Sequence, residues 1–146
     1  MKRFRRILHP TDFSKASRPA FRKALDLARR ERAELRLVHV VMPPALFLED
    51  SFMTARTYRD LVDATRRTAL RHLAPLLTRA KTARVRARAS VLEGIPFEEI
   101  VREARRRRAD LVVMGTHGRT GVARFFLGSV AARVLALAPC PVLTVR

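Results

Sequence analysis

Short apolar runs alternate with longer amphipathic segments along this chain of 146 residues. The runs cover residues 6–9, 35–41, 85–92, 111–114 and 142–145. Their length and their content of Val, Leu and Ile predict β-strands. The second run is apolar enough to be buried on both faces of a sheet, whereas the third begins with alternating apolar and basic residues and is expected near a sheet edge.

The segments between these runs carry apolar residues at helical spacing. The first helix is expected to begin at a capping serine, Ser14 or Ser17, and Pro19 favours the later start. Its apolar face consists of Ala20, Phe21, Ala24, Leu25 and Ala28.

Three further helices complete the pattern. A long helix follows residue 51, and Pro75 is expected to kink it or to shorten its end. A third helix begins at Pro96, in the first turn where proline is tolerated, and a fourth covers residues 129–138. The apolar positions of the long helix are Leu61, Thr65, Ala69, Leu73 and Leu76.

Strand and helix therefore alternate four times before a last strand. This order predicts a single α/β domain over residues 1–146, with a parallel sheet and helices on both faces, since parallel strands need crossover connections. In a doubly wound sheet, ligands bind at the carboxyl ends of strands where the strand order reverses. The candidate loops follow the first and fourth strands, and they carry Asp12 and Gly115.

The fourth strand leads into a glycine-containing stretch, M-G-T-H-G-R-T-G-V-A-R-F-F-L-G-S-V, at residues 114–130. Gly115 and Gly118 allow a tight turn, and Gly128 and Ser129 open the last helix. Backbone amides in such a loop and at a helix N-terminus point toward one place and attract an anion without any lysine. The stretch therefore predicts a phosphate-binding loop.

The glycine spacing, two residues and then nine residues between glycines, occurs together with I-L-H-P-T-D-F-S at 7–14, L-V-H-V at 37–40 and A-P-C-P-V-L-T-V at 138–145. These blocks, in this order over nearly the whole chain, resemble the nucleotide-binding members of the universal stress protein family. The resemblance implies a Rossmann-like doubly wound sheet of five parallel strands in the order 3-2-1-4-5, with four main helices. It also implies ATP as the ligand, with Mg²⁺ bound through its phosphates, and a regulatory role in the stress response.

The predicted nucleotide site joins the two candidate loops. Asp12 is expected to accept hydrogen bonds from a ribose hydroxyl or the adenine amino group, although it could instead cap the loop before the first helix. The glycines are expected to admit and bind the phosphates, or else to serve only turns with positive φ. Arg119 could reach a phosphate or face solvent. The resemblance adds residues for the adenine side and the pocket walls, and the full set is Pro10, Thr11, Asp12, Val40, Met114, Gly115, Gly118, Arg119, Gly128, Ser129 and Val130.

Binding is better supported by the sequence than catalysis. No Gly-Lys-Ser/Thr follows the glycines, and no metal carboxylate or water-activating base is evident, so the chain has no visible machinery for fast phosphoryl transfer. Slow ATP hydrolysis or autophosphorylation, with Thr116, Thr120 or Ser129 as acceptor, is the alternative. A hydrolase triad is disfavoured because the Gly-x-Ser-x-Gly elbow is missing.

The formal net charge is +18, and 27 of the 31 basic residues are arginine. Such a charge favours contact with nucleic acid or another polyanion. The absence of Asn and Gln also fits a thermophilic composition or a skewed genome, which is the competing explanation. The run Arg105–Arg108 falls at the end of the third helix, where cations complement the helix dipole, so a solvated turn is expected there.

The remaining features suggest an ordinary soluble protein. No apolar run reaches the ~18 residues that a membrane helix needs and no signal peptide precedes Ile7, so a cytoplasmic location is expected.

His9, His39 and His117 lack ligand-spaced partners and are interpreted as structural, without a metal. Cys140 is expected to be a small buried apolar residue. The last strand, 142–145, is short and apolar, and the resemblance implies that it pairs in a homodimer.

Overall fold

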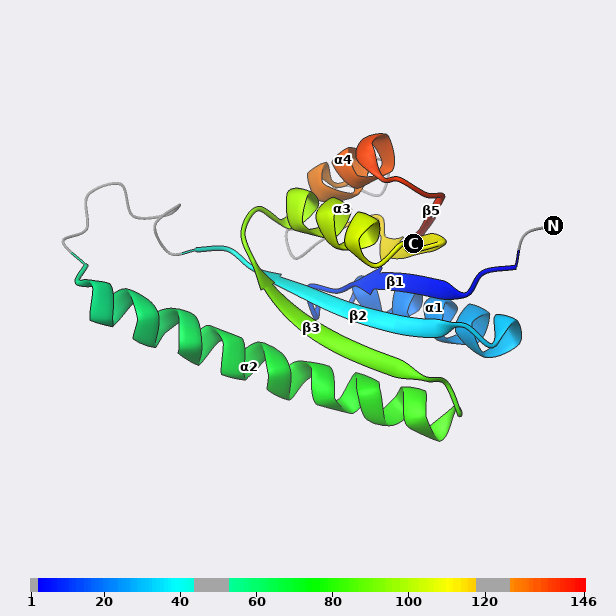
Figure 1. Ribbon diagram of the computed structural model, residues 1–146, viewed down its shortest axis with the longest axis horizontal. Helices are drawn as coiled ribbons and strands as arrows, with labels where there is room; N and C mark the ends of the chain where they lie inside the picture. Colours follow the sequence, from blue (N-terminus) through cyan, green and yellow to red (C-terminus); the bar gives the residue numbers. More distant parts are fainter. Residues whose placement is uncertain (1–2, 44–52, 118–126) are drawn as a thin grey trace.

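The computed structural model describes residues 3–43, 53–117 and 127–146. Strands and helices alternate through these ranges (Figure 1). The strands are β1 (Arg6–Pro10), β2 (Glu34–Val41), β3 (Ala87–Glu93), β4 (Leu111–Gly115) and β5 (Val142–Val145). The helices are α1 (Ser17–Glu31), α2 (Ala55–Thr82), α3 (Pro96–Arg106) and α4 (Ser129–Leu137).

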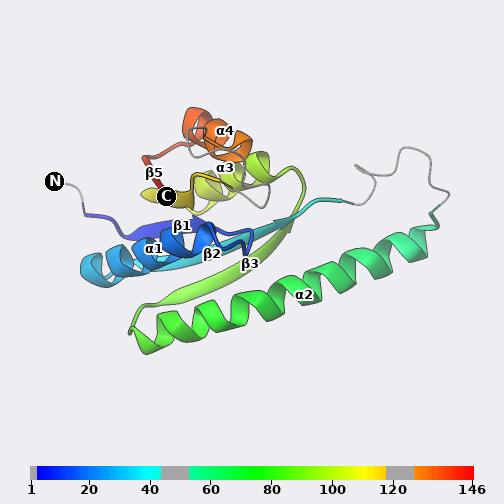
Figure 2. The same ribbon diagram turned by 180° about the vertical axis from the view of Figure 1, so that it is seen from behind.

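The five strands form one parallel sheet in the order β3-β2-β1-β4-β5. The predicted fold class and strand order are therefore confirmed, and β3 lies at the sheet edge as expected. Helices α1 and α2 cover one face, and α3 and α4 cover the other (Figures 1 and 2). Because the order reverses between β1 and β4, their carboxyl ends flank the switch point.

Each sheet face packs on its own apolar core. Alternate residues of the strands supply the two cores, since successive side chains point to opposite faces. Ile7, Leu35 and Val113 pack toward α1 and α2, and Leu8 and Val112 pack toward α3 and α4. Burying each such side chain stabilises the fold by about 1.5–3 kcal/mol.

Two local expectations need correction, and a third is confirmed. Helix α1 begins at Ser17 with Ala16 as its N-cap, so Ser17 is not the cap; instead the Ser14 hydroxyl accepts a hydrogen bond from the Ser17 N–H at 3.2 Å. Strand β2 is buried on both faces as expected, with Leu35 in one core and Val38 in the other. The second correction concerns the long helix.

Helix α2 continues through Pro75 to Thr82, so the proline does not end it. Leu73 and Ala80 are buried on either side of the proline, and this packing holds both flanking turns against the sheet. At the other end, the first turns of α2 extend beyond the strands (Figures 1 and 2). Leu61 is therefore exposed rather than part of an apolar face. Within the described ranges, no helix is long and apolar enough to cross a membrane.

Candidate functional site

A cavity of about 540 Å³ lies at the carboxyl ends of β1, β2 and β4. Parallel pairing of β1 with β4, with Leu8 beside Val112, brings the loops after these strands together. The first turns of α3 and α4 close the cavity from one face. Nine of the predicted residues line it: Pro10, Thr11, Asp12, Val40, Met114, Gly115, Gly128, Ser129 and Val130. Gly118 and Arg119 lie outside the described residues, as does Thr120.

The loop after β1 is held by its own hydrogen bonds. The Thr11 N–H donates to the Val38 carbonyl at 2.8 Å, and the Thr11 hydroxyl accepts from the Phe13 N–H at 3.1 Å. Phe13 has a φ of 64°, in the left-handed region that a non-glycine residue seldom adopts. Asp12 accepts from the Ser14 N–H at 3.0 Å through Oδ1. Asp12 therefore organises the loop before α1 and also lies on the cavity wall.

His39 is a cavity residue that the sequence reasoning missed. Its Nδ1 lies 2.8 Å from the Thr11 carbonyl oxygen, and its ring stacks on Phe13 with centroids 4.4 Å apart. The imidazole thus ties the end of β2 to the loop after β1. Its place near the end of the second strand was the available signal, since every parallel strand ends at the same edge of the sheet.

Gly115 owes its identity to close packing rather than to a positive φ. A Cβ added there would lie 3.2 Å from the Ala16 carbonyl oxygen and 3.4 Å from the His117 carbonyl oxygen. Gly94 is the only glycine with positive φ in the described part of the chain. Gly115 therefore lets β4 end directly against the N-terminal side of α1, on the lining of the cavity.

The N-terminus of α4 supplies the anion-attracting part of the site. Gly128 is its N-cap and offers no capping side chain. The Gly128 N–H itself donates to the Thr116 carbonyl at 2.7 Å, so the amides directed along the helix axis begin at Ser129. First-turn amides have no partner within the helix, and the dipole there favours negative charge. Residues 129–131 therefore present backbone donors at the cavity.

The cavity lining is also partly apolar. Val40, Met114 and the Val130 side chain belong to this apolar part, and Ile100 of α3 extends it. Apolar side chains together with a few polar backbone donors are the usual composition of a small-molecule site, and the volume falls within the ~300–1,000 Å³ of such sites. Ile100 and Thr65 were not predicted, because only the tertiary packing of α3 and α2 brings them to the strand ends.

The histidines have structural contacts. His9 is fully buried, with Nδ1 2.8 Å from the Val113 carbonyl oxygen, and burial lowers the pKa of His9 to about 4 despite that hydrogen bond and the charge of Asp12. His117 Nδ1 lies 2.8 Å from the Thr116 hydroxyl. No group of three metal-ligating side chains occurs among the residues that the structure describes.

Cys140 is half-buried. Burial raises the pKa of its thiol, and the charge of Asp110 raises this pKa further, whereas the hydrogen bond with the Val112 backbone acts to lower it. A raised pKa lowers the thiolate fraction at neutral pH, and the thiolate is the reactive form.

The fold and this cavity define a class: doubly wound α/β proteins with a ligand cleft at the switch point of the sheet. The chain belongs to the universal stress protein family, whose model matches residues 3–146. A universal stress protein of Methanocaldococcus jannaschii is 37% identical over 146 residues, which cover 98% of this chain and 82% of that protein.

Solved structures agree with this assignment. Universal stress protein UspA from Lactobacillus plantarum superimposes with a TM-score of 0.86 at 27% identity, and the match covers 100% of both chains. A universal stress protein in complex with cAMP superimposes with a TM-score of 0.68 at 24% identity over 99% of this chain and 98% of that chain. Members from Archaeoglobus fulgidus and Arabidopsis thaliana carry dAMP and AMP, respectively.

Proposed function

We propose that this protein binds ATP in the cleft at the carboxyl ends of β1, β2 and β4 and acts as a nucleotide-responsive regulatory module in the stress response. The observation that carries the proposal is the arrangement of the α4 N-terminus, Gly115 and Asp12 around one cavity with an apolar wall. Adenine nucleotides in several solved family members support it.

The roles of the lining residues follow from their chemistry. The amides of Ser129 and Val130 suit the phosphates, together with the Ser129 hydroxyl. Asp12 suits a hydroxyl of the ribose or the adenine amino group, because an ionised carboxylate only accepts hydrogen bonds. Val40 and Met114 suit the base. Magnesium would enter with ATP, held through its phosphates.

The test is calorimetric titration of ATP with magnesium at about 0.3 M salt, where the Debye length is well below ~10 Å and attraction to surface arginines is damped. GTP is titrated in parallel. We expect saturable binding of ATP, weaker binding of GTP, and loss of ATP binding in Gly128→Val, because a branched side chain at the α4 N-cap would crowd the phosphates. Ala136→Val, at an exposed position of the same helix, is the matched control. Equal binding of ATP and GTP, or binding that survives in Gly128→Val, would overturn the proposal.

Slow ATP hydrolysis or autophosphorylation is the second candidate. The Thr116 hydroxyl lies on the cavity wall, 2.8 Å from His117 Nδ1, which places a possible acceptor beside a possible base. Transfer of the γ-phosphoryl group to Thr116 would release ADP and a proton. Mass spectrometry after incubation with ATP tests the autophosphorylation: phosphate on Thr116 that disappears in Thr116→Val supports it, and unmodified protein after complete binding contradicts it. Release of ADP and inorganic phosphate, measured in the same reaction, tests the hydrolysis, and its absence contradicts that part.

We further propose a homodimer that forms through β5. This strand pairs with β4 on one side only within the described sheet, and all four of its residues are half-buried. Sedimentation velocity should show a dimer that Thr144→Lys dissociates, since edge lysines oppose strand pairing. Thr82→Lys, at the exposed end of α2, should leave the dimer intact. A monomer at all concentrations would contradict the proposal. A cytoplasmic location and a thermophilic source stay predictions.

A further inference from the structure

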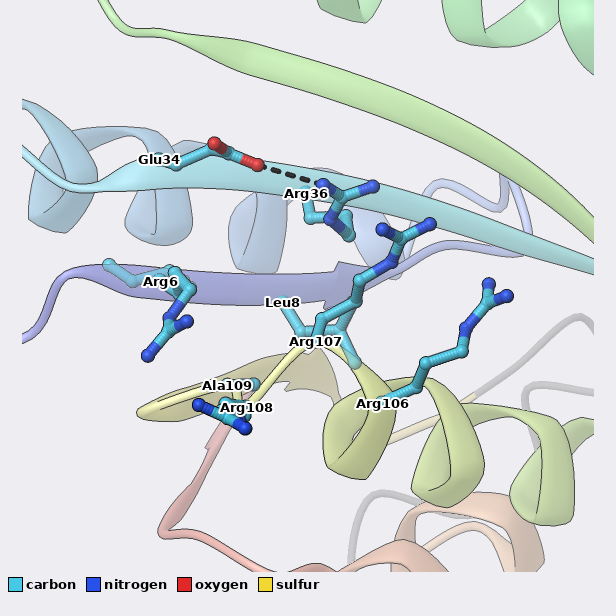
Figure 3. Close-up of a pocket in the computed structure, with 9 residues that line it drawn as sticks. Arg6, Leu8, Glu34, Arg36, Arg106, Arg107, Arg108 and Ala109 are labelled. Atoms are coloured by element: carbon cyan, nitrogen blue, oxygen red, sulfur yellow. Dashed lines mark hydrogen bonds and ion pairs between the residues drawn. The ribbon is translucent and has the colours of Figure 1, made fainter.

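A second hollow, of about 430 Å³, lies at the opposite end of the sheet, where β1 and β2 begin and α3 ends. Five arginines line it, from β1, β2, the end of α3 and the turn that follows α3: Arg6, Arg36, Arg106, Arg107 and Arg108. In Figure 3, Arg107 extends across β1 toward Arg36 with Arg106 beside it, and Arg6 and Arg108 lie at the other end of the group. We call this hollow the arginine hollow.

Strand register and a helix end explain why the arginines converge. In the parallel pairing of β1 and β2, Arg6 is opposite Glu34 and Leu8 is opposite Arg36, so these residues share the sheet face that α3 covers. Arg108 has a φ of 50°, which turns the chain back toward β4 directly after α3. The helix end is largely solvated, as expected from the sequence, and it also borders the hollow beside the first residues of β1 and β2.

Carboxylates compensate only part of this charge. Arg36 bonds to Glu34 at 2.9 Å. Glu103 is 2% exposed and accepts from both Arg106 and Arg107. Asp110 accepts from the backbone N–H groups of Arg5 and Arg6, at 2.9 Å each.

The sum leaves a positive excess. If all three of these carboxylates are set against the five guanidinium groups, an excess of two positive charges remains. The C-terminal end of α3 offsets about half a charge. Arg6 and Arg108 are exposed and form no ion pair with any residue in the described ranges.

We propose that the arginine hollow is a second ligand site, distinct from the nucleotide cleft, that binds a short oligophosphate chain. Guanidinium groups stay charged at any physiological pH and match phosphate oxygens in bidentate pairs. The remaining charge excess favours a ligand with more than one negative charge. A bounded hollow with converging arginines suits a compact anion better than the extended backbone of a nucleic acid.

The probe is inorganic tripolyphosphate, titrated by calorimetry at about 0.15 M salt, where the Debye length is ~8 Å. We expect saturable binding that weakens at least tenfold in Arg6→Ala/Arg108→Ala. These positions are exposed, so the double variant should keep its fold, which circular dichroism verifies. The matched control is Arg22→Ala/Arg29→Ala, which removes two exposed arginines from α1 on the other sheet face and should change the affinity less than twofold.

Separate outcomes distinguish this site from the nucleotide cleft. Gly128→Val should retain tripolyphosphate binding; loss of binding in that variant alone would assign the phosphates to the cleft and overturn the proposal. If both double-arginine variants bind tripolyphosphate equally more weakly, the anion is attracted by the positive charge of the whole surface and not by the arginine hollow. That result would also overturn the proposal. A single-stranded oligonucleotide is tested as a competitor. If it displaces tripolyphosphate, and its affinity rises steadily with oligonucleotide length, the ligand of the arginine hollow is a nucleic acid and the oligophosphate proposal is overturned. Failure of ATP to bind the cleft would leave these results unaffected.

Discussion

The two ends of the sheet use different chemistry to attract negative charge. At the carboxyl end, the cleft presents backbone amides of α4 and an apolar wall, with Asp12 as a charged group on its lining. At the amino end, the arginine hollow presents charged side chains, several of them held by carboxylates. Backbone donors are fixed by the fold and select by shape, whereas guanidinium groups act through charge and depend more on salt. A net charge of +18 therefore does not by itself identify the ligand site.

The largest expected effect is a pH-dependent loss of unfolding free energy. It destabilises both ends of the sheet, because His9 lies in β1, which runs between them. Burial lowers the pKa of His9 to about 4, from an ordinary value of 6.5. As pH falls below 6.5 the unfolded chain binds the proton first, so stability is lost between pH 6.5 and about 4. At ~1.4 kcal/mol per pKa unit, the loss approaches about 3 kcal/mol.

Chemical unfolding of the protein and of His9→Gln at about pH 7 and about pH 4.5 measures this loss. The glutamine variant does not titrate, so its unfolding free energy should change less between the two pH values. Parallel changes in the two proteins would show that other groups carry the pH dependence.

A second prediction concerns the amino end of the sheet alone, where Glu103 holds two arginines of the arginine hollow. Burial acts to raise the pKa of Glu103, but hydrogen bonds from Arg106 and Arg107 and their charges outweigh it, so the pKa of Glu103 lies below its ordinary value. Glu103→Gln should cost about 2 kcal/mol of unfolding free energy at neutral pH, less than a fully buried pair because both arginines are partly exposed.

Guanidinium-induced unfolding measures that change. Because the pKa of Glu103 is depressed in the folded state, its contribution is present above the pKa of the unfolded chain and is lost as pH falls through the folded value. Glu98→Gln, exposed on the first turn of the same helix, should cost less than about 1 kcal/mol. Equal costs for the two variants would mean that the interactions of Glu103 with its arginines do not stabilise this end.

The two ends also differ in how far the sequence predicts them. The strands and helices follow from their apolar periodicity, and the cleft follows from strand order, because residues directly after parallel strands must meet at one edge. Together with the strand order 3-2-1-4-5 that the family resemblance implies, the sequence is therefore enough to predict that Asp12 and Gly115 lie together. The arginine hollow could not be predicted in this way, since Arg6, Arg36 and Arg107 lie at unrelated sequence positions.

Two details of the cleft could not be predicted from the sequence, and the physical reason is the same for both. The requirement for glycine at position 115 comes from the Ala16 carbonyl oxygen, which is brought there by the packing of α1 on β4. Thr65 lies on the cavity lining because α2 packs along β2 and β3. Local propensity describes neither contact, because both depend on how whole elements pack.

A third prediction weakens only the cleft end. Gly115→Ala places a methyl group 3.2 Å from the Ala16 carbonyl oxygen, and that oxygen belongs to backbone that cannot move without shifting the start of α1. We expect a loss of about 1–2 kcal/mol of unfolding free energy, since overpacking of this kind typically costs ~1–3 kcal/mol. Tripolyphosphate binding at the arginine hollow should be unchanged. A variant as stable as the parent protein would show that α1 yields easily.

The smallest expected effect tests whether the cleft recognises more than phosphate. Asp12→Asn keeps an oxygen to accept from the Ser14 N–H, so the loop after β1 should hold its shape. The neutral amide is a weaker acceptor than the carboxylate, and hydrogen bonds that involve a charged group are worth roughly twice as much as neutral ones. ATP affinity, measured by calorimetry, should fall about five- to tenfold, whereas tripolyphosphate affinity should stay the same. An unchanged ATP affinity would assign Asp12 to the loop alone, and the cleft would then resemble the arginine hollow in recognising phosphate and little else.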